Sequence, residues 1–269
     1  MEIRPEIQDI ASEAALWRQE LHRSPGVAYD EAFASEFIQQ KLTRWQIAYE
    51  KAWGVNIPQQ SGIKGAGGHG IVATVSGNLD SGKTIGLRAD IDALHIQEKS
   101  GQPWASTKKG LMHACGHDGH TATLLSVAKY FSKDENRNFK GTLKLIFQPA
   151  EEGAKGMNAM LTEGLLYRHP MDAVFAMHNW PDLPLGQIAV HPGPVMASST
   201  YFDIKISGTA AHVAKFDQAN SAILLAAEIA KAFPPSTREG DVENWHSTEL
   251  THIRAGSPNA RGTIPADGL

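Results

Sequence analysis

The stretch Thr142-Leu143-Lys144-Leu145-Ile146-Phe147-Gln148-Pro149-Ala150-Glu151-Glu152-Gly153 joins an apolar run to a pair of acids. The run is apolar enough to form a buried strand, and the acids follow where that strand ends. Two further strand patterns, over residues 84–89 and 172–177, lie on either side of it in the chain, and helical patterns separate the three. Strands that alternate with helices predict an α/β fold, with a sheet flanked by helices.

Each of these strands is followed by a polar side chain that can bind metal or move protons. The residues are Asp90 and Asp92 after the first strand, Glu151 and Glu152 after the second, and His178 after the third. In open α/β sheets, ligands bind outside the carboxyl ends of the strands, so we expect these side chains to gather at one edge. Of two adjacent glutamates, one can bind a metal while the other takes a proton from water.

The segment Met112-His113-Ala114-Cys115-Gly116-His117-Asp118-Gly119-His120 places the one cysteine of the chain among three histidines and an aspartate. Cys and His bind borderline-soft divalent ions, and the segment precedes a helical pattern over residues 121–131, whose dipole favours a thiolate. A free cysteine is more often a small buried hydrophobe. Convergence with the strand ends favours a metal site, but spacing alone does not rank the candidates His113, Cys115, His117 and His120.

The composition restricts the partners and the compartment. The 269 residues are 42% hydrophobic and 20% charged, as in a soluble globular protein of one large or two modest domains. A net charge of -4 offers no basic surface for nucleic acid, and no apolar run is long enough to cross a membrane. Because one cysteine cannot form an internal disulfide and the N-terminus has no signal-peptide pattern, we expect a cytoplasmic protein.

Two rival enzyme classes are disfavoured by the context of their motifs. Residues 65–70 satisfy G-x-G-x-x-G, but they precede the strand pattern of residues 71–75, whereas a nicotinamide-binding fingerprint follows a strand and opens a helix. A zinc deaminase needs a later P-C-x-x-C, which a chain with one cysteine cannot supply.

Four segments together resemble the amidohydrolase branch of the co-catalytic metallopeptidases, which includes hippurate hydrolases, N-acyl-amino-acid amidohydrolases (aminoacylases) and auxin-conjugate hydrolases. They are residues 113–120 and 148–153, together with Arg88-Ala89-Asp90-Ile91-Asp92-Ala93-Leu94 and Met177-His178-Asn179-Trp180-Pro181. The resemblance implies a metal-binding catalytic domain with a mixed sheet, whose N-terminal part is residues 1–193. It also implies an α+β lid or dimerisation domain in residues 194–269, with a strand over 201–206 and a packing helix over 221–233.

The resemblance also implies a function and its residues. The chain would hydrolyse the amide bond of a small N-acyl or N-aroyl amino acid by metal-activated water, using two divalent ions (Mn, Zn, Co or Ni), and would form a homodimer through the lid. The implied residues are Glu151 as general base, Asp92 as orienting carboxylate, Cys115, His117, Glu152 and His178 as metal ligands, and His212 as a donor to the substrate or the developing oxyanion.

The sequence departs from the family pattern at three places. His95 replaces a proline, and Pro25-Gly26-Val27 replaces Pro-Glu-Leu. Family members continue beyond the lid and return to the catalytic domain with a last histidine ligand, whereas this sequence ends at Leu269. We therefore expect an incomplete lid and metal shell, and the alternative function is that of a non-catalytic, truncated fragment.

Overall fold

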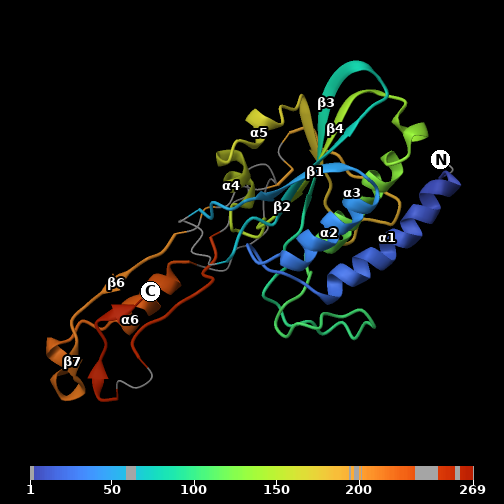
Figure 1. The fold of residues 1–269 in the computed structure, drawn as a ribbon. Coiled ribbons are helices and arrows are strands. Elements are labelled where there is room, and N and C mark those ends of the chain that lie inside the picture. Colours follow the sequence, from blue (N-terminus) through green and yellow to red (C-terminus); the bar gives the residue numbers. More distant parts are fainter. Residues whose placement is uncertain are drawn as a thin grey trace. The chain divides into compact units, whose positions relative to one another are not determined.

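The computed structural model describes residues 3–58, 65–193, 195–196, 200, 202–233, 248–257 and 261–268 (Figure 1). The chain divides into two compact units, Met1–Gly186 and Gln187–Leu269. Among the described helices, none combines the length and the apolar composition that crossing a membrane requires.

The first unit is built on a five-stranded sheet with the strand order β1-β2-β4-β3-β5. The strands are β1 Ala48–Trp53, β2 Gly70–Ser76, β3 Leu79–Asp90, β4 Lys140–Gln148 and β5 Ala173–Ala176. β3 is parallel to both β4 and β5, whereas β2 is antiparallel to β1 and β4. This arrangement confirms the predicted mixed sheet and brings the carboxyl ends of β3, β4 and β5 to one edge.

Helices cover both faces of this sheet (Figure 1). They are α1 Pro5–Arg23, α2 Ala32–Arg44, α3 His117–Phe131, the 3-10 helix η2 Asp134–Arg137, α4 Gly156–Thr162 and α5 Leu165–Arg168. On β2, Ile71 and Ala73 pack in the main core with residues of α1, α2 and α3, whereas Val72 packs with Met160 and Leu165 of α4 and α5. Successive strand residues thus face opposite helical layers, which explains why the strands are apolar along their length.

Two predicted elements differ from the structure. One of the helical patterns that separate the predicted strands, over residues 157–166, forms two short helices, because Gly164 has φ +90° and stops α4 before α5 begins. The helix predicted over residues 121–131 already starts at His117, which is therefore its first residue rather than a residue before it. Both differences involve glycines in the left-handed region, Gly164 and Gly116.

β5 lies at an edge of the described sheet and is only four residues long. Its neighbouring side chains Val174 and Phe175 point to opposite faces of the sheet, and they are 48% and 58% exposed. Neither face of this strand is therefore covered by the described residues to the extent that β2 and β4 are.

The second unit contains two small antiparallel pairs and one longer helix. Its elements are β6 Ile206–Ser207, β7 Ala211–His212, the 3-10 helix η3 Val213–Gln218, α6 Ala222–Lys231, β8 Thr263–Ile264 and β9 Asp267–Gly268. β6 pairs with β9 and β7 with β8, and Ile206 packs against Ala222 and Ala226 of α6. Of the strand predicted over residues 201–206, only Ile206 is in a strand, and Tyr201 lies outside the described residues.

Candidate metal centre

The turn between Cys115 and His117 depends on the glycine between them. Gly116 has φ +93°, a conformation that side chains with a Cβ rarely adopt. A Cβ placed on Gly116 would also lie 2.2 Å from the Asn179 side-chain oxygen. The turn therefore requires glycine on two counts, and it directs both neighbouring side chains toward the carboxyl edge of the sheet.

His117 is fully buried and is oriented by Asp92. Its Nδ1 lies 2.9 Å from the Asp92 carbonyl oxygen and 3.2 Å from Asp92 Oδ1. Its Nε2 is buried without a hydrogen-bond partner among the described residues, and it lies 3.7 Å from Glu152 Oε1 and 4.0 Å from Glu151 Oε2. An imidazole held at Nδ1 by a carboxylate, with a free Nε2 facing acids, is the usual arrangement of a metal ligand.

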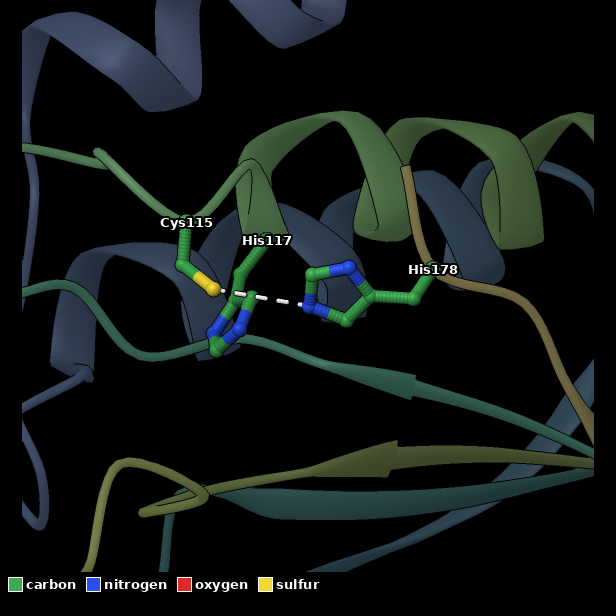
Figure 2. A group of neighbouring side chains, drawn as sticks. All are labelled: Cys115, His117 and His178. Carbon is green, nitrogen blue, oxygen red and sulfur yellow. Dashed lines mark hydrogen bonds between the residues drawn. The ribbon is translucent and has the colours of Figure 1, made fainter. Parts of the chain in front are cut away.

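Cys115 and His178 approach His117 from two different segments (Figure 2). Cys115 Sγ lies 3.4 Å from His178 Nε2, and one ligand atom from each of the three residues falls within 4.8 Å of the others. His178 Nδ1–H donates to the Asn179 carbonyl oxygen at 2.7 Å, so its Nε2 is the nitrogen that faces the thiol. The structure thus brings together a sulfur and two nitrogens that sequence reasoning had proposed as ligands.

The paired glutamates complete the cluster around His117 Nε2. Their side chains are partly accessible, 41% for Glu151 and 24% for Glu152. Glu152 is held by its backbone N–H, which donates to Asp92 Oδ2 at 3.0 Å. Burial, and then the charge of Glu152, raise the pKa of the Glu151 carboxyl. A carboxylate with a raised pKa and partial exposure is suited to accept a proton from water.

The side chains around Cys115 are mainly acidic, and a bound cation would balance their negative charge. Burial, and then the neighbouring Glu152, raise the pKa of the Cys115 thiol to about 12, because nearby carboxylates disfavour a second negative charge. The effect of the α3 dipole, which the sequence predicts to favour a thiolate, is therefore outweighed by burial and by the neighbouring acids. Sulfur, imidazole and carboxylate donors around one orphaned nitrogen fit a divalent ion of the zinc or manganese class, which would stabilise the thiolate.

A hydrogen-bonded chain behind the cluster was not predicted from the sequence. His120 Nδ1 lies 2.6 Å from Asp90 Oδ1, and His120 Nε2 accepts from the Asn179 backbone N–H at 3.0 Å. Burial opposes ionisation of Asp90, but the hydrogen bond with His120 and the charges of His117 and Arg88 lower its pKa to about 2. Asn179 adjoins His178, so the chain fixes the segment that carries this candidate ligand. In the sequence, the one sign of a role for Asp90 is its position at the end of a predicted strand.

Two other histidines of the sequence analysis have different surroundings within their own units. His113 is buried beside His22, with ring centroids 6.3 Å apart, and burial lowers its pKa to about 4. It belongs to none of the candidate metal groups among the described residues. His212 lies in the second unit, where its Nδ1 accepts from the Ala214 N–H at 3.1 Å.

The first turn of α3 is anchored by Asp118, whose side chain is fully buried. Its Oδ2 accepts from Arg18 Nε at 3.1 Å and from His22 Nδ1 at 2.8 Å. Although burial opposes it, the hydrogen bond from His22 lowers the pKa of Asp118, and the same bond raises the pKa of His22. The pair therefore stabilises the fold over a window of pH. The contribution of Asp118 is lost as the pH falls through its lowered pKa, and that of His22 is lost as the pH rises through its raised pKa.

Replacing Asp118 by alanine is expected to lower the free energy of unfolding by about 3–5 kcal/mol at neutral pH, because it breaks the buried ion pair with His22 Nδ1 and leaves Glu98 as the remaining described ion-pair partner of that histidine. Urea denaturation of the variant measures this loss. The matched control is Asp134→Ala, which removes an ion pair with Arg137 from a side chain that is 87% exposed. That change should cost less than about 1 kcal/mol. Equal losses in the two variants would contradict the anchoring role.

A family model described as peptidase family M20/M25/M40 matches residues 86–262. The chain is 38% identical over 257 residues to hippurate hydrolase of Campylobacter jejuni, an alignment that covers 95% of this chain and 63% of that protein. It is 40% identical over 195 residues to N-acetylcysteine deacetylase of Bacillus subtilis, covering 72% of this chain and 47% of that protein. The chain thus spans less than two thirds of the length of these relatives.

The structure resembles that of the YXEP protein of Bacillus subtilis, which is described as a dinuclear metal-binding peptidase from the M20 family. The TM-score is 0.67 and the sequence identity is 30%, over 97% of this chain and 63% of that protein. The similarity therefore includes the sheet edge where the candidate ligands meet.

Proposed function

The chain belongs to peptidase family M20/M25/M40, and on that premise we propose that it hydrolyses the amide bond of N-acyl or N-aroyl amino acids. The proposal rests on one observation, the gathering of Cys115, Glu151, Glu152 and His178 around His117, whose Nε2 is buried without a hydrogen-bond partner among the described residues. The names of the relatives agree with this substrate class, because hippurate hydrolase and N-acetylcysteine deacetylase are both named for the removal of an acyl group from an amino acid.

The proposed division of roles follows from the contacts. Cys115, His117, Glu152 and His178 would hold up to two divalent ions, and Asp92 orients His117 at Nδ1 and Glu152 at its backbone N–H. A bound divalent ion lowers the pKa of a water molecule and polarises the substrate carbonyl. Glu151, held beside the cluster with a raised pKa, accepts the proton of the attacking water and returns it to the leaving amine.

The remaining assignments concern the whole protein. We propose that residues 1–193 belong to the catalytic domain and that residues 194–269 belong to a lid, through which a homodimer forms. His212 would then donate a hydrogen bond to the substrate or to the developing oxyanion. We also propose a cytoplasmic location and manganese, zinc, cobalt or nickel as the native ion.

Removal of divalent metal is expected to abolish amino-acid release, because the proposed reaction depends on a bound ion to lower the pKa of the attacking water and to polarise the substrate carbonyl. The protein is incubated with a chelator, its metal content is measured, and release is followed on a panel of N-benzoyl and N-acetyl amino acids. Manganese or zinc added back should restore activity. Full activity of metal-free protein would contradict the proposal.

The alternative function, a non-catalytic fragment, makes a different prediction in the same experiment. It predicts no release from any member of the panel even when metal analysis shows that the ions have been restored. The chain's coverage of 63% of its hippurate hydrolase relative keeps this alternative open to test.

A further inference from the structure

We infer that Glu31 is a positioning residue, whose buried carboxyl group holds the loop of residues 149–156 in the conformation that presents Glu151. We call these residues the glutamate loop. The inference rests on the proposed role of Glu151 as general base. Glu31 directly precedes α2, more than a hundred residues from the loop in the sequence, and sequence analysis assigned it no role.

The glutamate loop has a strained backbone. Ala150 and Lys155 have φ values of +52° and +59°, although neither residue is a glycine. Gly156 approaches the Pro149 carbonyl so closely that a Cβ at this position would lie 1.8 Å from the oxygen. Conformations of this kind cost about 1–3 kcal/mol each and persist only where surrounding contacts enforce them. The loop therefore needs anchors outside itself.

Two buried carboxyl groups provide these anchors on either side of Glu151. Glu31 Oε1 accepts from the Ala150 backbone N–H at 2.8 Å. Asp92 Oδ2 accepts from the Glu152 backbone N–H at 3.0 Å. The residue before Glu151 and the residue after it are thus each fixed by a side chain from another segment. Asp92 belongs to the metal cluster, whereas Glu31 touches none of the candidate ligands in any hydrogen bond described for it.

The Glu31 side chain is itself held in place by burial and by a second hydrogen bond. It is fully buried, and its Oε1 also accepts from the Tyr29 backbone N–H at 2.9 Å. The Tyr29 hydroxyl donates to the Ala154 carbonyl oxygen at 2.8 Å, which adds a contact at the far end of the loop. Tyr29 itself has φ +62°. The segment of Tyr29 and Glu31 and the glutamate loop are therefore two strained segments, and hydrogen bonds join them.

The geometry requires an acceptor at this position rather than a charge. Burial, and then the nearby Asp92, raise the pKa of the Glu31 carboxyl to about 8. Glutamine has the same length and the same carbonyl acceptor, so Glu31→Gln should keep the contact to Ala150. Aspartate keeps the acid but withdraws the acceptor by one methylene, and alanine removes it altogether.

The experiment compares Glu31→Ala, Glu31→Asp and Glu31→Gln by two readouts, with Ser35→Ala as the control. Ser35 is a buried polar residue of α2, one turn further on, whose hydroxyl accepts from Gln39 and not from the loop. Amide hydrogen exchange over residues 150–153 reads the order of the loop without any substrate. kcat and KM of the metal-loaded protein read the placement of Glu151.

We expect exchange over residues 150–153 to accelerate at least about tenfold in Glu31→Ala and Glu31→Asp. In these variants kcat should fall by about 10- to 100-fold with KM changed less than about threefold, since a displacement of about 1 Å suffices for such a loss. Glu31→Gln and Ser35→Ala should stay within about threefold of the original protein in both readouts.

Folded Glu31→Asp with unchanged exchange would overturn the inference, and so would Glu31→Gln that is as impaired as Glu31→Asp. Because exchange needs no substrate, the test also separates this inference from the proposed function. If the original protein releases no amino acid but Glu31→Asp still accelerates exchange, the positioning role stands and the proposed reaction fails. If release is normal and exchange does not change, the reaction stands and the positioning role fails.

Discussion

Replacing Glu151 by glutamine is expected to lower kcat by about 10²–10⁴-fold, the usual contribution of a general base, while metal binding is retained. Glutamine keeps the size of the side chain and its partial exposure, but its amide cannot accept a proton. Because the proposed role of Glu151 is proton transfer and ion binding is assigned to Glu152, the loss should fall on turnover rather than on ion affinity. Steady-state kinetics with the metal-loaded variant and metal analysis of the same sample measure both quantities.

The control for this change is Glu135→Gln, which alters a glutamate on η2 whose side chain is 72% exposed. Its kcat should equal that of the original protein. If Glu151→Gln were to keep its full kcat with ions bound, Glu151 would not be the base, and the search would move to another acid of the cluster. A loss of ions from Glu151→Gln would instead make Glu151 a ligand.

Replacing His117 by alanine is expected to abolish metal binding at micromolar ion concentrations. Among the described residues, three groups of side chains could hold an ion, and His117 belongs to each of them. The groups are Cys115 with His117 and His178, Asp90 with His117 and His120, and His117 with Glu151 and Glu152. Loss of a mere outer hydrogen-bond partner weakens ion affinity by about 10–100-fold, so removal of the shared ligand should exceed that range. Calorimetric titration of the protein with manganese or zinc measures the change in ion affinity.

His95→Ala is the appropriate comparison, because it removes an exposed histidine near the carboxyl end of β3. Its ion affinity should not change. A thermal unfolding scan without metal separates loss of a ligand from loss of the fold, since Asp92 would be left buried without its histidine partner in His117→Ala. Undiminished affinity in folded His117→Ala would remove this residue from the centre of the site.

The parts of the molecule that depend on local pattern were predictable from the sequence. The strand patterns over residues 71–75, 84–89 and 142–147, which become β2, β3 and β4, follow from side-chain periodicity, and periodicity is a property of the local sequence. The rule that strand ends carry the ligands brought Cys115, Glu152 and His178 to one edge, and the structure places them there.

The parts that depend on contacts between distant segments were not predictable. Insertion of β4 between β2 and β3 is settled by pairing across the sheet, such as Ile71 opposite Phe147, and no local signal specifies it. Glu31 reads in the sequence as an ordinary acid before a helix, because its partner Ala150 is recognisable only after folding. Asn179 was likewise seen only as part of a motif, and its contact with His120 is a property of the tertiary structure.

The edge strand β5 gives one side of the candidate site less packing support than the other, within the described residues. His178 follows this four-residue strand, whose apolar side chains are about half exposed, whereas His117 begins a buried helix. Segments with few buried contacts open locally at a small fraction of the free energy of global unfolding. In the part of the chain that the structure describes, the hydrogen bond of the Asn179 backbone N–H to His120 therefore contributes more to holding the His178 segment than the packing of β5 does.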